Sequence, residues 1–461
     1  MVKLKLFGTS GVRGEININL TPELAVKLSL AFSNFLGNFG TIAIGRDVRI
    51  QSKVLAKACI SGAISGGLNV INVGVVPTPA LLHIVKELKL NGAIMVTASH
   101  IPPKYAGILF FLGDTAELTP DEHKILERMI LENKFKHCSW SEIGKVEYFD
   151  GSLDIYLKAI IRQVNVRKIR SFGAKVLIDP SNSAQSLFLV EIANEFGCKI
   201  FTLNDFPCEY FPGRGPDLHP RTLKFTSNYC KTLNVDFGIA TDGDGDRCLF
   251  IDSNGKVLWG DTSGCIFAFR ELSRLKGGII VCPVNTSNLI FHVAKLCNGS
   301  VHLTKVGPPA IIGAVKKLGN VIFAFEESGK YIWPDNVLYG DPALALGKMI
   351  EILSERSVSL SNLVSSFPKY YRVKVAVDCP ENIKLKVLNE VKKRINELNP
   401  VKIIDIDGLK LIFKDDSWLL FRPSGTEPVF RVFSESKDKI LAEKLANLGV
   451  KLIKNIVSKF I

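Results

Sequence analysis

The chain has 461 residues, of which 47% are hydrophobic and 22% are charged, and it carries a formal net charge of +13. This length exceeds what one hydrophobic core usually serves and favours three or four domains, and the lack of any run of about 18 apolar residues implies no membrane span. The positive charge suits an anionic partner, but the lysines are spread along the chain without an interleaved aromatic and basic motif, so nucleic-acid binding is not expected.

Three successive regions are each predicted to begin with a buried strand. Each opens with a short β-branched, apolar run that ends in a polar loop, at residues 41–47, 175–182 and 278–285. Ser, Thr or Asn residues near the end of each run favour a helix N-terminus there. A second strand-like run follows in each region, at residues 69–76, 198–203 and 301–306.

A third apolar run in each region precedes a loop that is rich in reactive side chains. These runs are residues 93–96 before T-A-S-H, 237–240 before T-D-G-D-G-D-R, and 321–324 before F-E-E-S-G-K. Apolar strands that alternate with helical stretches predict βαβ units and a parallel sheet. Because ligands gather at the carboxyl ends of such strands, we expect one repeated architecture to present three different loops at equivalent places.

The C-terminal part of the chain lacks this rhythm and favours a separate α+β domain. Its strand-like runs are residues 369–377, 409–413 and 417–421 and a further strand through Phe433, and its helical stretches are residues 383–398 and a closing helix from Lys437. The predicted fold class is α/β, with three tandem, topologically similar α/β domains of mixed, largely parallel sheets and one C-terminal α+β domain. The expected domains are residues 1–149, 150–251, 252–366 and 367–461.

Three aspartates at alternate positions, Asp242, Asp244 and Asp246, follow the second of the third runs and precede Arg247. Ionised carboxylates that close repel one another and favour a counter-cation, and the intervening glycines let the three side chains converge. An EF-hand is excluded by spacing, because its sixth position requires glycine and its twelfth requires glutamate, where this chain has Arg247 and Ser253. A Mg²⁺ ion that also contacts a phosphate is the expected occupant.

The loop T-A-S-H-I-P-P offers Ser99 as a nucleophile or phosphate carrier, although a Ser/Pro turn is an equally ordinary interpretation. Adjacent side chains on an extended segment point in opposite directions, so a proton relay between Ser99 and His100 is not expected. Arg13 lies in the glycine-rich segment F-G-T-S-G-V-R-G, which could also be a plain turn. Arg46 and Arg49 are interpreted as structural ion-pair partners.

Two further loops suit a phosphorylated sugar. R-P-S-G-T-E-P at 422–428 combines a bidentate arginine with hydroxyls and a flexible turn, as an anion-binding nest requires. In F-E-E-S-G-K, Glu326 and Ser328 stand two residues apart and could hold vicinal hydroxyls. A solvated turn is the alternative interpretation of each.

These five motifs together resemble the α-D-phosphohexomutase family, which includes phosphoglucomutase, phosphomannomutase and phosphoglucosamine mutase. The resemblance runs the whole chain, with F-G-T-S-G-V-R-G, T-A-S-H-x-P-P, T-D-G-D-G-D-R, E-E-S-G and R-P-S-G-T-E-P in family order. It implies four domains around a central cleft and an intramolecular phosphotransferase that interconverts hexose 1-phosphate and hexose 6-phosphate. It also implies a phosphoserine enzyme, a bisphosphorylated sugar intermediate, and priming by an activator such as glucose 1,6-bisphosphate.

The same resemblance assigns roles to residues of this chain. Ser99 would carry the phosphoryl group, and its phosphate would share Mg²⁺ with Asp242, Asp244 and Asp246. Arg13 and Arg247 would steady the group in transfer. The remaining implied roles are sugar binding by Glu326, Ser328 and Lys330, and binding of the non-reacting phosphate by Arg422, Ser424, Gly425 and Thr426.

The chain departs from the family pattern S-H-N-P-x-x-x-N-G-x-K in its phosphoserine loop. Both asparagines are replaced, by Ile101 and Ala106, and the lysine expected to act as general acid/base is Leu109. Leucine cannot transfer a proton, and such help typically contributes about 10²–10⁴-fold. Lys104, or Lys330 in place of the sugar loop's usual histidine, could supply a replacement ammonium.

Three hypotheses follow from these motifs and departures. The first is an active mutase of phosphomannomutase/phosphoglucomutase type, and the second is a phosphoglucosamine mutase. The third is a degenerate paralogue that binds a phosphosugar without turning it over. Scattered cysteines with no C-x-x-C pair indicate reduced thiols, and the apolar start is too short for a signal peptide, so we expect a cytoplasmic protein; the oligomeric state stays open.

Overall fold

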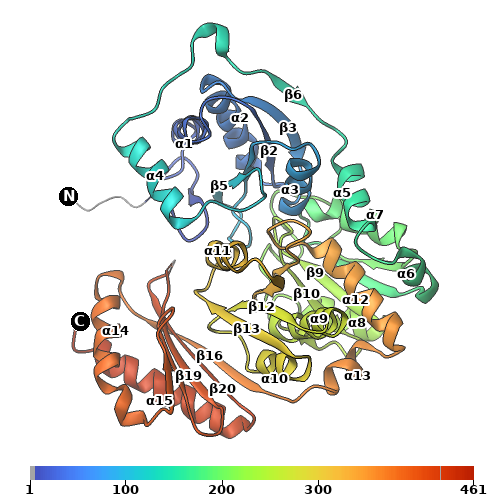
Figure 1. Cartoon of the computed structure of the whole chain (residues 1–461), viewed down its shortest axis with the longest axis vertical. Helices are drawn as coiled ribbons and strands as arrows, with labels where there is room; N and C mark the ends of the chain where they lie inside the picture. Colours follow the sequence, from blue (N-terminus) through green and yellow to red (C-terminus); the bar gives the residue numbers. More distant parts are fainter. Residues whose placement is uncertain (1–5, 426, 461) are drawn as a thin grey trace. The chain divides into compact units, whose positions relative to one another are not determined.

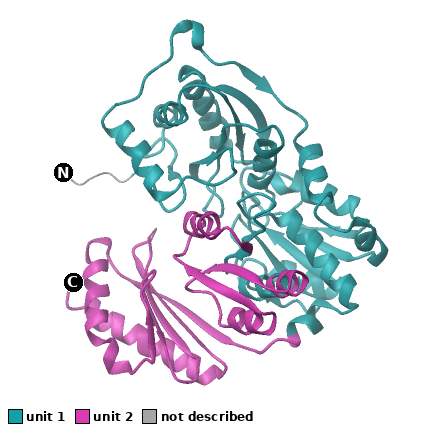
Figure 2. Ribbon diagram, in the orientation of Figure 1, with its two compact units in different colours: residues 1–267, 323–364 teal, residues 268–322, 365–461 magenta. Residues whose placement is uncertain are grey.

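The structure, a computed structural model, describes residues 6–425 and 427–460. The chain forms two compact units, residues 1–267 with 323–364 and residues 268–322 with 365–461 (Figure 2). The order of helices and strands along the chain can be followed in Figure 1.

The first unit opens with a six-stranded mixed sheet in the order β1-β5-β4-β2-β3-β6. Its strands are β1 (Val12–Glu15), β2 (Thr41–Arg46), β3 (Asn69–Val75), β4 (Gly92–Val96), β5 (Tyr105–Leu112) and β6 (Val146–Tyr148). β4, β2, β3 and β6 run parallel to one another, as predicted for the first region, whereas β5 returns antiparallel to β4 and pairs with β1. The loop after β4 is therefore the turn of a β-hairpin.

Four helices cover this sheet, and two of them, the first and the last, have clear capping signals at their starts. The four helices are α1 (Pro22–Phe35), α2 (Ile50–Ser65), α3 (Thr78–Glu87) and α4 (Pro120–Leu131). The Thr21 hydroxyl caps α1 and Pro22 occupies its first turn, while Thr119 and Glu122 form a capping box on α4. α1 and α2 pack side by side (Figure 1), and their buried faces share one hydrophobic core with the sheet.

A second sheet of the first unit has the order β11-β10-β9-β7-β8. Its strands are β7 (Lys175–Asp179), β8 (Lys199–Thr202), β9 (Phe237–Thr241), β10 (Cys248–Asp252) and β11 (Val257–Leu258). β8, β7 and β9 are parallel, and β10 returns antiparallel to β9. The accompanying helices are α5 (Ser152–Ile161), α6 (Val166–Phe172), α7 (Leu189–Glu195) and α8 (Lys224–Thr232), with a short 3₁₀ turn at Ala184–Leu187. Another 3₁₀ turn, Trp140–Glu142, precedes β6 of the first sheet.

The first unit ends with a hairpin and two helices. β14 (Val321–Phe325) and β15 (Tyr331–Ile332) pair antiparallel, so the third chemistry-bearing loop is again a hairpin turn. α12 (Pro342–Arg356) is capped by Asp341, whose carboxylate also accepts hydrogen bonds from His83 and Tyr156. α13 (Leu360–Ser365) follows α12, whereas α9 (Gly260–Leu275) begins in the first unit and ends in the second.

The second unit contains the parallel pair β12 (Gly278–Pro283) and β13 (Gly299–Thr304), with α10 (Leu289–Leu296) and α11 (Pro308–Leu318). Its other sheet is antiparallel throughout, in the order β16-β20-β19-β18-β17. These strands are β16 (Tyr371–Asp378), β17 (Lys402–Ile404), β18 (Leu409–Ile412), β19 (Trp418–Pro423) and β20 (Val429–Ser436). α14 (Lys384–Arg394) and α15 (Lys439–Val457) pack on them, with 3₁₀ turns at Glu381–Ile383 and Ile395–Leu398.

The predicted C-terminal strands and helices are confirmed within a few residues. The domain boundaries predicted from the sequence stay a prediction. Among the described residues, no helix combines the length and the apolar composition that crossing a membrane requires.

Protonation of His123 on α4 is expected to destabilise the fold. Its ring stacks on Phe7 with centroids 4.5 Å apart, and burial lowers the pKa of the imidazole to about 4. The folded-state pKa thus lies below the usual value near 6.5, so the unfolded chain binds the proton more readily. The contribution of His123 to stability is complete above pH 6.5 and is lost progressively as the pH falls toward 4.

We therefore expect His123→Phe, which retains the stacking, to reduce the acid sensitivity of unfolding. Between pH 7 and pH 5 the wild type should lose about 2 kcal/mol more free energy of unfolding than the variant, measured by urea denaturation at each pH. His137→Phe, at an exposed position after the same helix, is the matched control and should follow the wild type. Equal losses in the wild type and in His123→Phe would contradict the assignment.

Candidate functional site

Ser99 lies in the hairpin turn between β4 and β5, and it is 2% exposed. Its backbone adopts a left-handed conformation with φ of 52°, an uncommon state for a residue other than glycine that usually marks a constrained site. The Ser99 amide donates to the Thr97 hydroxyl at 2.9 Å, and Thr97 in turn donates to Asp47 at 2.7 Å. The serine is therefore held by its backbone, which leaves its hydroxyl available for chemistry.

Arg49 holds the backbone of the same loop. Its guanidinium is fully buried, forms an ion pair with Asp47, and donates to the backbone oxygens of Ser99 at 2.8 Å and Ile101 at 2.6 Å. Asp47 also accepts from Ser52 at 2.6 Å. The interpretation of Arg49 as a structural ion-pair partner is confirmed, and its two carbonyl contacts show what it holds in place.

The three aspartates occupy the hairpin turn between β9 and β10 and are all buried. One carboxylate oxygen from each of Asp242, Asp244 and Asp246 lies within 4.8 Å of the others. Thr78, at the first turn of α3, donates its hydroxyl to Asp244 at 3.1 Å and its amide to the Asp244 carbonyl at 2.9 Å. Sequence reasoning missed Thr78, because it lies more than 160 residues away from the loop that it supports.

The serine loop and the aspartate loop meet directly. The Ser99 hydroxyl donates to the Asp242 carboxylate at 2.9 Å. The Ser99 carbonyl oxygen lies 2.5 Å from where a Cβ on Gly243 would stand, so only glycine allows this approach. Two loops that are separated by about 140 residues in sequence therefore place a hydroxyl against a carboxylate cluster, as the sequence predicted.

The electrostatics of the cluster favour a cation. Burial and the neighbouring Asp246 raise the pKa of Asp242 to about 6, and burial with both neighbouring carboxylates raises the pKa of Asp244 well above its usual range. The Oδ1 atom of Asp244 is buried and has no hydrogen-bond partner among the described residues. Hard divalent cations prefer such carboxylate oxygens, so the residues present fit a metal ion.

Basic side chains surround the cluster. Arg247 lies 3.8 Å from Asp242 and 3.7 Å from Asp246, and it contacts His100 Nδ1 at 3.0 Å. The charge of Arg247, followed by burial and the charge of Arg13, lowers the pKa of His100 well below its usual range, which keeps the imidazole neutral. Arg13, on β1 opposite Gly107, is the second arginine that the sequence placed here.

The expected divergence of Ser99 and His100 is wrong. The His100 Nδ1 atom lies 3.4 Å from the Ser99 hydroxyl. The left-handed backbone at Ser99 is the reason, because the alternation of side chains holds only on an extended segment. The hydroxyl nevertheless makes its shorter contact with Asp242.

The sugar-loop residues predicted from sequence lie in the turn between β14 and β15. The Glu326 amide donates to the Lys330 carbonyl at 2.9 Å, and the Ser328 hydroxyl lies 3.3 Å from the Glu326 carboxylate. The Cys248 amide, directly after the aspartate loop, donates to the Gly329 carbonyl at 2.9 Å. This bond ties the sugar loop to the aspartate loop, so both belong to one site.

Lys330 occupies a different environment from an ordinary sugar contact. Its ammonium is 2% exposed, lies 2.8 Å from Asp246, and stands 3.9 Å from the centre of the Tyr339 ring. The Tyr339 hydroxyl contacts Glu117 at 3.3 Å, and Ser10 donates to Glu117 at 2.6 Å. Sequence reasoning missed Tyr339 and Glu117, since neither belongs to a recognisable motif.

The predicted phosphate loop belongs to the second unit. Arg422 at the end of β19 forms an ion pair with Asp407 at 2.7 Å. Lys384 is buried and donates to the carbonyls of Ser424 and Glu427, both at 2.6 Å. Gly425 is exposed in the same turn, and Thr426 lies outside the described residues. Lys384 and Asp407 are supports that the motif did not reveal.

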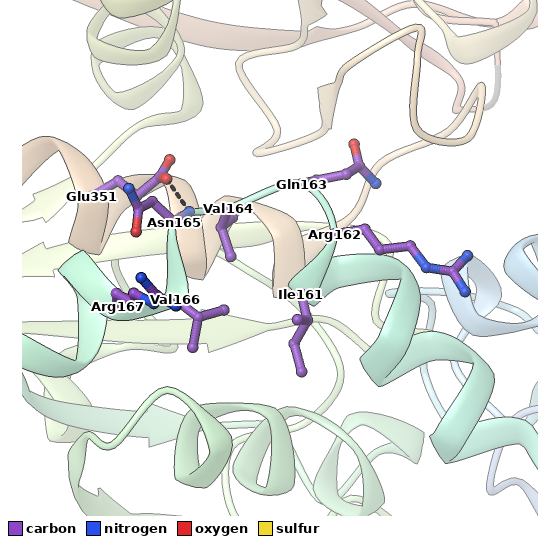
Figure 3. Close-up of a pocket in the computed structure, with 8 residues that line it drawn as sticks. All are labelled: Ile161, Arg162, Gln163, Val164, Asn165, Val166, Arg167 and Glu351. Atoms are coloured by element: carbon purple, nitrogen blue, oxygen red, sulfur yellow. Dashed lines mark hydrogen bonds between the residues drawn. The ribbon is translucent and has the colours of Figure 1, made fainter.

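A separate pocket of about 590 Å³ lies between the end of α5, the start of α6 and α12 (Figure 3). It is lined by residues 161–167 and Glu351, whose carboxylate accepts from the Asn165 amide. None of the described candidate site residues lines this pocket. It lacks a converging set of reactive groups and is not the site of the chemistry.

Similarity to known proteins assigns the chain to a family. The chain matches four descriptions in order: phosphoglucomutase/phosphomannomutase alpha/beta/alpha domain I at residues 4–137, domain II at 154–255, domain III at 259–371, and the C-terminal domain at 375–448. The four-domain fold class that the sequence predicted is confirmed by these matches and by structural similarity.

Two relatives and one solved structure are similar to this chain over almost its whole length. A phosphoglucosamine/phosphogalactosamine mutase from Sulfurisphaera tokodaii is 38% identical, covering 97% of this chain and 99% of its own length. A phosphoglucomutase/phosphomannomutase from Thermococcus kodakarensis is 37% identical, covering 97% and 98%. The crystal structure of a phosphoglucomutase/phosphomannomutase family protein from Burkholderia thailandensis has a TM-score of 0.88 at 23% identity, covering 99% and 98%. The chain belongs to the phosphoglucomutase/phosphomannomutase family of α-D-phosphohexomutases.

Proposed function

We propose that this phosphohexomutase interconverts hexose 1-phosphates and hexose 6-phosphates of the mannose and glucose series, with Ser99 as the phosphoryl carrier. The observation that carries the proposal is the 2.9 Å contact between the Ser99 hydroxyl and Asp242, inside a buried cluster of three aspartates. A hydroxyl of low reactivity needs such activation or a pre-loaded phosphoryl group.

The proposed reaction proceeds in two transfers. In the first, the phosphorus–oxygen bond to Ser99 breaks while a bond forms between the phosphorus and a free sugar hydroxyl, and the proton of that hydroxyl ends on the Ser99 oxygen, which becomes a neutral alcohol. The product is a sugar bisphosphate. The bisphosphate then reorients in the site and transfers its other phosphoryl group to Ser99. The Ser99 proton passes to the sugar oxygen, so atoms and charge balance over the cycle. Such a transfer depends on positioning and charge neutralisation more than on covalent chemistry.

The residues of the site take separate roles in this proposal. Arg13 and Arg247 are the guanidinium groups that neutralise the phosphoryl oxygens, a task that suits their forked geometry. Glu326 and Ser328, with Lys330, bind the sugar. The non-reacting phosphate is assigned to the loop with Arg422, Ser424, Gly425 and Thr426.

Mg²⁺ is the proposed metal, held by Asp242, Asp244 and Asp246 together with an oxygen of phosphorylated Ser99. Bound there, the ion would supply charge neutralisation on the phosphoryl oxygens. The unpartnered Oδ1 atom of Asp244 supports this assignment. Mg²⁺ binds through few carboxylates plus phosphate, which matches the donor set.

The proposal extends to partners and location. The partner is a phosphorylated hexose, and a glucose 1,6-bisphosphate-type activator primes Ser99. A cytoplasmic location is supported by the ten cysteines, all of them described and free.

The choice between neutral hexoses and glucosamine is decided by relative kcat/KM on mannose, glucose and glucosamine phosphates, with the neutral hexoses expected to be preferred.

Our first functional prediction concerns covalent loading of Ser99. Incubation with glucose 1,6-bisphosphate should add one phosphoryl group to the wild type, located on the peptide with Ser99 by mass spectrometry. Ser99→Ala should accept none and should lose more than about 10⁴-fold in turnover in a coupled assay, while still binding glucose 1-phosphate in calorimetry. The exposed Ser139→Ala is the control and should behave as the wild type. An unmodified, inactive wild type that binds the sugar phosphate would instead identify a degenerate binding protein.

A second prediction concerns the metal. Because the three buried carboxylates repel one another, Asp244→Asn should raise the melting temperature in EDTA. Mg²⁺ should stabilise the wild type, by about 2.7 kcal/mol at a hundredfold excess over its Kd, and should stabilise Asp244→Asn far less. Asp205→Asn, which removes an exposed carboxylate, should leave the Mg²⁺ effect unchanged. Thermal unfolding with and without the ion measures both changes, and a wild type indifferent to Mg²⁺ would refute the metal assignment.

A further inference from the structure

The site lacks a cation where the family resemblance leads one to expect a lysine. Leu109 stands there, in β5, where its backbone pairs with Met95 and its side chain is 1% exposed. A leucine side chain offers neither charge nor a hydrogen bond. If the chain is active, as the proposed function requires, another group must act on the phosphoryl oxygens in its place.

The direction of Leu109 is set by strand alternation. Ile108 and Phe110 belong to the hydrophobic core under the first sheet, which places Leu109 and Phe111 on the opposite face of β5. The Phe111 ring meets Tyr339 edge-on, with centroids 5.2 Å apart. The face of β5 that carries Leu109 is thus turned toward Tyr339.

The ammonium of Lys330 reaches the same tyrosine from another loop. It lies 3.9 Å from the centre of the Tyr339 ring and 2.8 Å from Asp246. Lys330 is therefore electrostatically part of the aspartate cluster, although its backbone belongs to the sugar loop.

Lys104, the other candidate from the sequence, has a different setting. Its side chain is 60% exposed and pairs with Glu15 at 3.0 Å. A solvent-exposed ion pair of this kind is screened by water and contributes little to the field inside a buried site. Burial and contacts thus favour Lys330 over Lys104.

We propose that Lys330 supplies the positive charge that Leu109 cannot, acting from the sugar loop on the phosphoryl group carried by Ser99. The Lys330 ammonium is a compact charge beside the acidic cluster that the Ser99 hydroxyl already contacts. Negative charge spread over the phosphoryl oxygens during transfer is stabilised by cations fixed in advance. This inference rests on the proposed function and moves Lys330 from a sugar contact to a transfer-site cation.

The pairing with Asp246 gives Lys330 a second consequence. A cation that already pairs with one of the three carboxylates competes with a metal ion for that carboxylate. Lys330→Met removes the competitor while keeping the apolar stem of the side chain. We expect this variant to bind Mg²⁺ more tightly than the wild type in calorimetry without substrate, a readout that does not depend on activity.

Kinetics with four variants test the main claim. Lys330→Met should lower kcat by about 10²–10³-fold, the usual loss for one preorganised charge at a transition state, with little change in KM. Lys330→Arg, which keeps the charge, should retain part of kcat. Leu109→Lys combined with Lys330→Met should have a kcat at least tenfold higher than Lys330→Met alone, because the lysine on β5 returns an ammonium to the site. Leu109→Met with Lys330→Met is the matched control and should not recover.

The outcomes separate the inference from the proposed function. A wild type that neither loads Ser99 nor interconverts hexose phosphates overturns both. An active wild type with unchanged kcat in Lys330→Met overturns the inference alone, as does a variant that raises only KM, which would make Lys330 an ordinary sugar contact. Loss of kcat without rescue by Leu109→Lys, in a variant that still binds Mg²⁺ and melts as the wild type does, also overturns it.

Discussion

The site depends on one electrostatic constraint: three carboxylates are buried within 4.8 Å of one another. Repulsion and desolvation both oppose this arrangement, and the surrounding structure offsets them. Arg247 and Lys330 lie against the cluster, Thr78 donates to Asp244, and Ser99 donates to Asp242. These contacts leave oxygens unpaired, such as Asp244 Oδ1, so the same repulsion would favour the divalent cation of the proposed function.

The same hairpin geometry presents each of the reactive loops in the first unit. β4, β9 and β14 are each followed by an antiparallel partner, so Ser99, the aspartates and the predicted sugar loop occupy hairpin loops rather than long crossovers. A hairpin turn is short and fixed at both ends by ladder hydrogen bonds. Positioning of this kind matters because phosphoryl transfer gains most of its rate from preorganised charge.

Sequence patterns predicted the parallel strands and the composition of the loops, because period, apolar length and motif spacing are local properties. They did not predict the antiparallel returns β5 and β10, which depend on pairing across the sheet. The supports Thr78, Glu117 and Lys384 were equally invisible, since each acts on a loop far away in sequence. Tyr339 is close in sequence to Lys330, which it contacts, but it belongs to no recognisable motif. The Ser99–His100 error had a local cause, because an extended segment was assumed where the backbone is left-handed.

In the proposed cycle, phosphate recognition and phosphoryl transfer use loops that are supported separately, as the loop with Arg422 illustrates. Its Arg422 is oriented by Asp407, and its turn is held by Lys384, all within the second unit. The transfer site draws its charges from the first unit. A sugar bisphosphate must present either phosphate to either site during the proposed cycle. Sites fixed by their own supports can each recognise a phosphate independently of the sugar between them, and this is the property that a reversible mutase requires.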